Sequence, residues 1–336
     1  MNAILTSFTR FPISFSKEFL TVAASTLVLL LLCVLFAPSS LSYGALSGSL
    51  PFAATLAIVG LGQMLVVQQG GFDLSVPGGV SLAVVISSHV PAGNSADLLP
   101  AILLAFVCAM GAGLINGFMV GFLRLNAIVA TIGMNALLFG GVFAVSGGVP
   151  RITTDLLAVI AGGEIYGIAN AIYFAIAIVL IFTIVMKQTV IGRRFEAVGA
   201  NPLAARAIGQ PIRLYQMMAY LFAQLHYCVA GILIAGITVQ PTAFQGNPLL
   251  LPSVAVVVLG GTSLLGGRGF PVATVIAAFF LSQLSQLALA VGLPYSAQTI
   301  IQALALGFGI AVYSLRWTRL KEFTLATKKE KTNEII

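Results

Sequence analysis

The chain has 336 residues, of which 59% are hydrophobic and only 7% are charged. An average soluble domain has about 25% charged residues, so this composition excludes a water-soluble fold, whose surface needs more charges. The net charge of +7 would suggest a nucleic-acid partner in a soluble protein. In a membrane protein the distribution of the charges matters more, and we predict a single helical membrane domain with no nucleic-acid partner.

Apolar stretches of about the length that crosses a bilayer, ~20 residues, recur along the whole chain. The sequence predicts an all-α fold, a polytopic transmembrane bundle of about ten helices. The first helix follows Arg10 and Lys17 as a signal peptide would, but because more spans follow we expect it to remain uncleaved. Division at charged residues and at Gly, Pro and Asn clusters gives spans at 19–37, 51–69, 76–92, 98–123, 127–146, 167–186, 214–238, 252–266, 270–291 and 297–315, the third and eighth being short.

The basic residues predict the orientation of this bundle. If the N-terminus is cytoplasmic, only Arg151 lies outside, which leaves fifteen of the sixteen Lys and Arg residues inside. Such an excess is typical of cytoplasmic loops and predicts that both ends are cytoplasmic. The predicted parts are an N-terminal segment at 1–18, a transmembrane domain at 19–315 and a basic tail at 316–336, which we expect to contact membrane lipid headgroups.

Two connections are long. The outer one, 147–166, carries Arg151, Asp155 and Glu164 and is a candidate docking site for an external partner. The inner one, 187–213, is the most basic. Within it Gly199, Asn201 and Pro202 signal a turn, and 203–208 reads as a short helix with Pro at its first turn. A short helix outside the membrane is typical of a docking element, although the basic charges alone are explained equally well by a loop that only fixes topology.

The stretch 70–79, GGFDLSVPGG, interrupts an apolar region with a carboxylate. A carboxylate at mid-membrane costs ~2.5–3.5 kcal/mol when it faces lipid, so Asp73 should face protein. Gly70, Gly71 and Ser75 around it favour a break at which Asp73 is the N-cap of the next helix and accepts its backbone N–H groups. The alternative is a functional role at a broken helix that borders a polar pathway.

Two further glycine patterns are predicted to be structural. The segment 259–271, LGGTSLLGGRGFP, contains Gly260, Gly261, Gly266 and Gly267. It lacks the GxxxxGK[ST] pattern of a phosphate-binding loop, which argues against nucleotide binding and favours a tight cytoplasmic turn. In the fourth span Gly113, Gly117 and Gly121 recur every four residues, a spacing that lets a neighbouring backbone approach one helix face.

Amide side chains within or at the ends of apolar spans form another group. Each of them alone is explained by a hydrogen bond between helices. Together, eight are candidates to line a path for a neutral, hydroxyl-rich solute, and they are Gln63, Gln68, Asn116, Asn135, Gln283, Gln286, Gln298 and Gln302. Gln69 and Gln224 are amides of the same kind. The two pairs on the last spans are three and four residues apart and so share a helix face.

The sequence contains no pattern of a catalytic or metal site. Cys33, Cys108 and Cys228 lie inside apolar stretches without metal-ligand spacing. The two histidines, His89 and His226, are far apart, and neither paired carboxylates nor an activated nucleophile is recognisable. We therefore predict no bound metal, no cofactor in this chain and no enzymatic activity of its own.

Four segments, in chain order, resemble motifs of the permease subunits of ribose-type sugar ABC importers, the inner-membrane components of binding-protein-dependent transport. They are GGFDLSVPGG at 70–79, LINGFMVGFLRLNAIVATIGM at 114–134, AVGANPLAARAIG at 197–209 and VVLGGTSLLGGRGFPVATVIAAFF at 257–280. The sequence departs from the family pattern at Pro77, where a small residue is usual, and at Ala127, where a proline is usual and whose loss should relax the entry into the fifth helix.

This resemblance implies a permease of the bacterial inner membrane that imports a pentose-like or hexose-like sugar. It implies a second permease subunit, either a copy or a paralogue, ATP-binding subunits that hold ATP and Mg, and a periplasmic sugar-binding protein. It also implies that the inner connection meets the ATPase through Glu196, Gly199, Asn201, Pro202, Ala204, Ala205, Arg206 and Gly209. The alternatives are a branched-chain amino-acid ABC permease and a stand-alone secondary transporter, which would need intramembrane charges, with a membrane enzyme a distant third.

Overall fold

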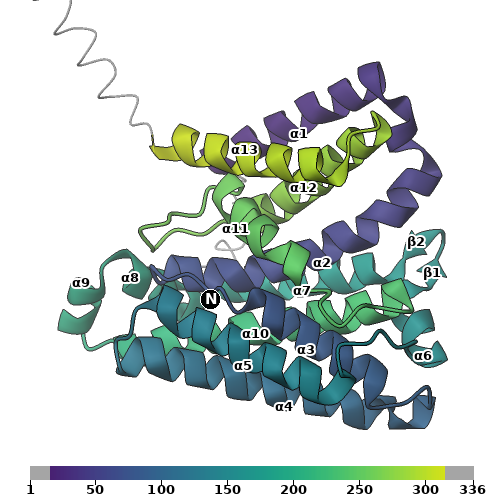
Figure 1. Cartoon of the computed structure of the whole chain (residues 1–336). Helices are drawn as coiled ribbons and strands as arrows, with labels where there is room; N and C mark the ends of the chain where they lie inside the picture. The colour runs from purple at the N-terminus through teal and green to yellow at the C-terminus, as the bar shows by residue number, and fades with distance from the viewer. Residues whose placement is uncertain (1–15, 315–336) are drawn as a thin grey trace, which may run out of the picture.

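The computed structural model describes residues 16–314 and is almost entirely helical, which confirms the predicted all-α class (Figure 1). A helix lies at each predicted span: α1 Lys17–Phe36, α2 Tyr43–Gln68, α3 Val76–His89, α4 Leu98–Gly117, α5 Ala127–Ser146, α7 Asn170–Gln188, α10 Ile212–Thr238, α11 Leu250–Leu259, α12 Pro271–Ala290 and α13 Tyr295–Ser314. The predicted basic tail, 316–336, and most of the predicted segment 1–18 lie outside the described residues.

Short elements connect these helices. They are the 3-10 turns η1 Pro38–Leu41, η2 Ser95–Asp97 and η5 Asn247–Leu249, the π turns η3 Phe118–Phe122 and η4 Ala158–Gly162, and the helices α6 Asp155–Leu157, α8 Val190–Ala200 and α9 Pro202–Ala207. The outer connection also contains an antiparallel hairpin, β1 Glu164–Ile165 with β2 Ile168–Ala169. Figure 1 places this hairpin and α6 at one end of the bundle, and α8 and α9 at the other.

Seven helices of the described part are long and apolar enough to cross a membrane. The chain is thus a multi-pass membrane protein. With 14 and 10 residues, α3 and α11 are shorter than the ~20 residues that a crossing needs, and they correspond to the two short predicted spans. The number of crossings and the cytoplasmic position of both ends stay predictions.

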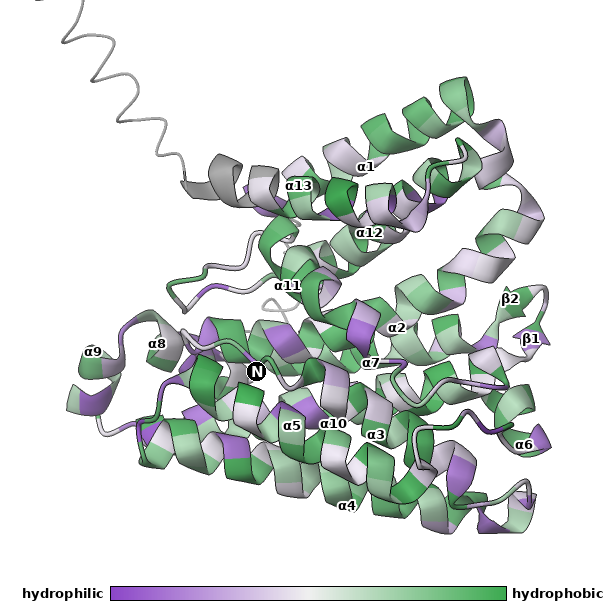
Figure 2. Ribbon diagram, viewed as in Figure 1, coloured by the Kyte–Doolittle hydropathy of each residue, from purple (hydrophilic) through white to green (hydrophobic). Residues whose placement is uncertain are grey.

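The core of the bundle is built around α2. This helix is buried along most of its length, and it packs against α10 on one side and against α12 on the other. In Figure 1, α1, α12 and α13 gather on one side of it, while α3, α4, α5 and α10 lie on the other. The outer helices α5 and α7 bury only a minority of their residues, and large hydrophobic residues are exposed on both. Hydrophobic residues predominate in the helices of the bundle as a whole (Figure 2). A helix that is apolar all round and half exposed in this way is adapted to lipid.

Contact between α4 and α10 depends on the glycine face of α4. A Cβ atom at Gly113 would lie 2.7 Å from the Cα atom of Leu221, and one at Gly117 would lie 2.6 Å from the carbonyl oxygen of Met217. At Gly121 it would lie 2.9 Å from the carbonyl oxygen of Arg213. The three glycines therefore let the two helix backbones touch without intervening side chains.

We expect Gly113→Ala to destabilise the protein by about 1–3 kcal/mol, because the new methyl group overlaps the α10 backbone. A matched control is available two residues away, since a Cβ at Gly111 would meet nothing within 4 Å. In thermal unfolding of the purified protein in detergent, the Gly113 variant should melt lower than the wild type. The Gly111→Ala variant should not, and equal melting of the two variants would contradict the packing assignment.

Candidate functional site

The first part of the site is the non-helical break between α2 and α3. Gly70 has a positive φ of +75°, and α3 begins at Val76. The prediction that Asp73 is the N-cap was wrong in detail, since the N-cap position belongs to Ser75. One Asp73 carboxylate oxygen, Oδ1, accepts the Ser75 backbone N–H at 2.9 Å and also the Ser75 hydroxyl. The carboxylate therefore closes a local turn before the helix starts, a conformation that Asp favours.

Ser75 is the centre of a buried polar network. Besides donating to Asp73, its hydroxyl oxygen accepts a hydrogen bond from Asn116 Nδ2 of α4 at 3.0 Å and from Gln224 Nε2 of α10 at 2.7 Å. All four side chains are fully buried. The network therefore links the break to two helices that lie far from it in the sequence.

Several atoms of this network are buried without a hydrogen-bond partner among the described residues. They are the second carboxylate oxygen of Asp73, the amide oxygens of Asn116 and Gln224, and the hydroxyl of the neighbouring Tyr220. An unsatisfied buried polar group costs about 1–3 kcal/mol of stability. Native proteins therefore contain few such groups, and those that occur often have a functional role. A cluster of four such atoms therefore makes the break a candidate functional site.

Two glycines of the break allow this crowding. A Cβ atom at Gly71 would lie 2.5 Å from the Tyr220 hydroxyl oxygen, and one at Gly79 would lie 2.5 Å from the Gln224 amide oxygen. One glycine of each pair in GGFDLSVPGG, Gly71 and Gly79, thus makes room for polar side chains of α10. A larger residue at either position would push these side chains out of the network.

Helix α5 satisfies two backbone groups of the same segment. Asn135 Oδ1 accepts the Gly78 N–H at 2.8 Å, and the Thr131 hydroxyl oxygen accepts the Leu74 N–H at 3.0 Å. Asn135 was among the predicted site residues, whereas Thr131 and Tyr220 were not. Neither residue gives a local signal, because Thr131 bonds Leu74, 57 residues away, and Tyr220 lies against Gly71, which is also far from it in the sequence.

The other amides proposed to line a path lie in separate helix contacts. Gln63 accepts a hydrogen bond from the Tyr227 hydroxyl at 2.8 Å. On the last helices, Gln283 donates to the Ser40 carbonyl oxygen and Gln286 to the Ala45 carbonyl oxygen. Gln298 donates to the Leu293 carbonyl oxygen and Gln302 to the Ser285 hydroxyl. Of the eight amides predicted to line a path, only Asn116 and Asn135 lie at the break in this conformation. The five glutamines named in this paragraph form hydrogen bonds elsewhere.

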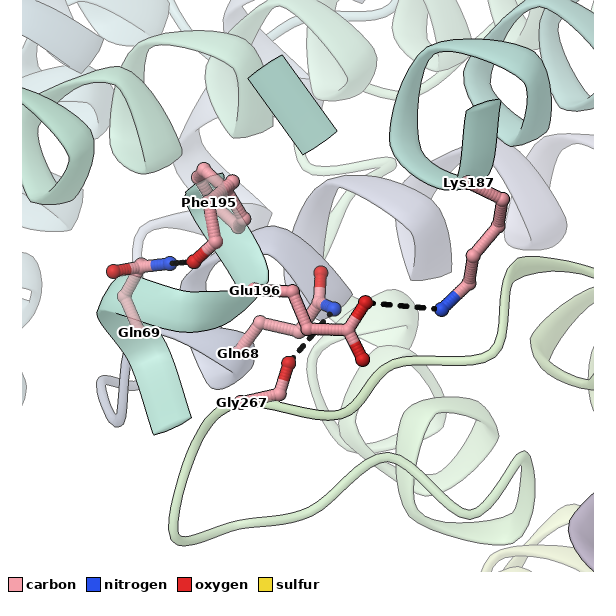
Figure 3. A network of polar contacts seen from close by, with 6 residues as sticks. All are labelled: Gln68, Gln69, Lys187, Phe195, Glu196 and Gly267. Carbon is pink, nitrogen blue, oxygen red and sulfur yellow. Dashed lines mark hydrogen bonds and ion pairs between the residues drawn. The ribbon is translucent and has the colours of Figure 1, made fainter. Parts of the chain in front are cut away.

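The second part of the site is a junction at the end of α2 (Figure 3). Gln68 exchanges two hydrogen bonds with Gly267 of the α11–α12 turn, accepting its backbone N–H at 2.8 Å and donating Nε2 to its carbonyl oxygen at 3.3 Å. Gln69 Nε2 donates to the Phe195 carbonyl oxygen of α8 at 2.9 Å. An ion pair between Lys187 and Glu196, 3.4 Å apart, joins α7 to α8 beside it. Three segments thus meet where α2 ends.

Glycines make this junction tight. A Cβ atom at Gly199 of α8 would overlap the Gln68 carbonyl oxygen. One at Gly266 would lie 2.6 Å from the Gly199 carbonyl oxygen, and one at Gly267 would lie 2.8 Å from Ala200. Gly266 and Gly267 also have φ values of +91° and +89°, which favour glycine. In the same turn Gly260 packs on Thr274, and Gly261 has a φ of +81°.

Helices α8 and α9 form an exposed pair beyond the junction. The short helix predicted at 203–208 is α9, and the Asn201 side chain caps it by accepting the Ala204 N–H at 3.0 Å. Helix α8 was not predicted, although its buried residues Phe195, Val198 and Gly199 follow helical spacing. Arg193 and Arg194 interrupted the apolar pattern there.

The α8–α9 pair presents part of the set that we predicted, together with two residues that we did not predict. Ala205 and Gly199 are buried, so the expectation that these two touch a partner does not fit the structure. Leu203 is 81% exposed and Ile208 is 71% exposed, and neither was predicted as a contact. Pro202, Ala204, Arg206 and Gly209 are exposed as well. Exposed apolar residues outside the bundle make α9 a candidate interface.

A membrane bundle with a broken helix, a buried polar network and an exposed helical pair at one end has the architecture of a transport protein. A family described as "Branched-chain amino acid transport system / permease component" matches residues 45–309. The chain belongs to this family of permease components.

Several curated proteins are similar to the chain. A probable ABC transporter permease protein of Sinorhizobium fredii is 32% identical over 265 residues, which are 78% of this chain and 79% of the relative. The autoinducer 2 import system permease protein of an Enterobacter species is 32% identical over 262 residues, 76% and 75% of the two chains. The ribose import permease protein of Escherichia coli K12 is 29% identical over 308 residues, 89% and 95% of the two chains. No solved structure matches.

Proposed function

We propose that this chain is the permease subunit of an ABC importer that carries a small sugar across the bacterial inner membrane. One observation supports this most directly: the similarity to the ribose import permease extends over 95% of that protein. It therefore includes both the break and the α8–α9 pair. A galactose/methyl galactoside import permease is 27% identical over 98% of its length. The buried network fits such a solute, because amide and carboxylate oxygens accept hydrogen bonds from hydroxyl groups.

The chain converts movement of its partners into alternating access and leaves ATP hydrolysis to them. Closure of the ATPase subunits moves the α8–α9 pair, and the junction at Gln68 transmits this movement to the end of α2. The break at Asp73 begins only a few residues further along. A hinge at the end of a helix absorbs such movement in many transport proteins. ATP and Mg belong to the partner, and this chain holds neither.

The proposed complex contains a second permease subunit, ATP-binding subunits and a periplasmic sugar-binding protein. The hairpin of β1 and β2 lies at the opposite end of the bundle from α9 (Figure 1). Its tip residue Tyr166 is 97% exposed, and Glu164 accepts a hydrogen bond from the Tyr43 hydroxyl at 3.3 Å, which fastens the hairpin to α2. We assign the binding protein to this end.

A branched-chain amino-acid importer is the second candidate, because the description of the matching family names that substrate. The two functions are separated by uptake into proteoliposomes that contain the chain with its co-encoded ATPase and binding protein. We expect accumulation of labelled ribose or galactose only with ATP, and none of labelled leucine. Leucine uptake without sugar uptake would favour the amino-acid importer. Sugar uptake without ATP and without the binding protein would indicate a secondary transporter.

The exposed apolar residue of α9 provides a test of the ATPase interface. We expect Leu203→Asp to weaken co-purification of the ATPase subunit about thirtyfold, since a central interface residue is worth about 2 kcal/mol or more. The control is Ile165→Asp in the hairpin, which is also exposed but lies at the opposite end. The control should retain the ATPase. Full retention by the Leu203 variant would exclude α9 from the interface.

A further inference from the structure

A groove of about 660 Å³ lies at the α9 end of the bundle, between α9, the π turn η3 and the start of α10. This volume is in the range of small-molecule sites. Three arginines line the groove, one from each of these regions: Arg206 from α9, Arg124 from the end of the η3 turn and Arg213 from α10. The groove thus collects positive charge from two parts of the chain, one at Arg124 and the other at Arg206 and Arg213.

No carboxylate balances this charge. None lines the groove, and among residues 16–314 the ion pair between Lys187 and Glu196 is the only one. The Arg213 guanidinium lies 6.0 Å from the centre of the Phe122 ring, which holds it at the helix end. A guanidinium group can donate two parallel hydrogen bonds to the oxygens of one phosphate. Three guanidinium groups in one groove therefore favour an anionic phosphate ligand.

The groove continues onto an apolar surface. Val120, Phe122 and Leu214 line it together with the arginines. The rings of Phe122 and Phe118 stack with their centres 5.6 Å apart. From there a stripe of exposed apolar side chains runs along α4 at intervals of three and four residues, which places them on one helix face, and it consists of Leu103, Val107, Met110, Leu114 and Phe118. A soluble phosphate compound would leave this apolar stripe uncovered, whereas the acyl chains of a phospholipid would cover it.

We propose that this arginine groove binds the headgroup phosphate of an anionic phospholipid, whose acyl chains lie along the α4 stripe. Basic pockets beside transmembrane helices bind anionic headgroups in this way. Since Arg206 belongs to α9 and the other two arginines to the bundle, the lipid joins the exposed helical pair to the membrane-embedded part. Anionic lipid therefore sets the position of α9 before any partner docks.

The test measures lipid binding to the purified full chain in the absence of partner subunits. Native mass spectrometry titrates the protein with phosphatidylglycerol and, separately, with phosphatidylcholine. We expect the triple variant Arg124→Gln, Arg206→Gln, Arg213→Gln to bind phosphatidylglycerol about a hundredfold more weakly, from the usual contribution of each basic residue. Phosphatidylcholine binding should not change. If the triple variant does not fold, Arg206→Gln alone, on an exposed helix, should weaken phosphatidylglycerol binding about fivefold.

A matched control removes the same number of positive charges from residues outside the groove. Arg193, Arg194 and Arg268 are exposed but do not line the groove, and their replacement by Gln should leave phosphatidylglycerol binding within twofold of wild type. Equal weakening by both triple variants would overturn the proposal in favour of general electrostatic attraction. Displacement of the lipid by inorganic phosphate at equal concentration would also overturn the proposal. A groove variant that keeps lipid selectivity but loses the ATPase would show a protein interface instead.

Discussion

Gly199→Ala is expected to lower ATP-driven uptake at least tenfold while the protein still reaches the membrane. The new methyl group overlaps the Gln68 carbonyl oxygen and lies about as close to the backbone of Gly267 as packing permits. Overpacking of this kind costs about 1–3 kcal/mol, or more where backbone atoms are involved. The junction can relieve the overlap only if α8 moves away from α2. The α8–α9 pair then loses its connection to the break.

The measurement compares sugar uptake and ATPase activity in proteoliposomes. Because the bundle itself is intact, the variant should keep ATP hydrolysis but lose uptake. Gly133→Ala in α5 is the control, since a Cβ atom there meets nothing within 4 Å, and it should transport normally. Normal transport by the Gly199 variant would remove the junction from the mechanism.

Asp73→Ala is expected to reduce the folded yield severely and to lower the melting temperature. It leaves the Ser75 backbone N–H and hydroxyl without their acceptor inside the bundle, at about 1–3 kcal/mol for each group. The hydroxyl then also holds Asn116 and Gln224 less well. The monodisperse fraction in size-exclusion chromatography and thermal unfolding in detergent measure the loss.

Asp73→Asn distinguishes the hydrogen bond from the charge. Its amide oxygen can still accept the hydrogen bonds that Ser75 donates to Asp73. We expect this variant to fold better than the alanine variant and to keep the same preference among sugars. A stable Asp73→Ala protein with altered sugar preference would instead make Asp73 a direct substrate contact.

The sequence was sufficient to predict where the membrane helices lie. Charged residues and turn residues bound each apolar stretch, so the limits of α5 were predicted to the residue. It was less informative for α8, because Arg193, Arg194 and Gly192 break the apolar run there. Its amphipathic face became visible only when Phe195 and Gly199 were seen to pack on the end of α2.

The candidate site was predicted in part. GGFDLSVPGG was identified because a carboxylate between glycines is out of place in an apolar region. Its partners were not predictable, since Gln224 lies 149 residues from Ser75 and the hydrogen bond between them leaves no local pattern. The same is true of the junction, where Gln68 and Gly267 meet across 199 residues. Helix packing, which no single segment specifies, makes both contacts.

The burial of α2 has a consequence for synthesis of the chain. Gln63 of α2 finds its partner in Tyr227 of α10, 164 residues later. At roughly 5–20 residues per second, a ribosome needs about ten to thirty seconds to add that length. During this time the Gln63 amide lacks the Tyr227 hydroxyl as a hydrogen-bond partner, because α10 has not yet been synthesised. Insertion of α2 is therefore complete only when α10 arrives, and a nascent chain interrupted before α10 exposes to lipid the helix that the finished protein buries most.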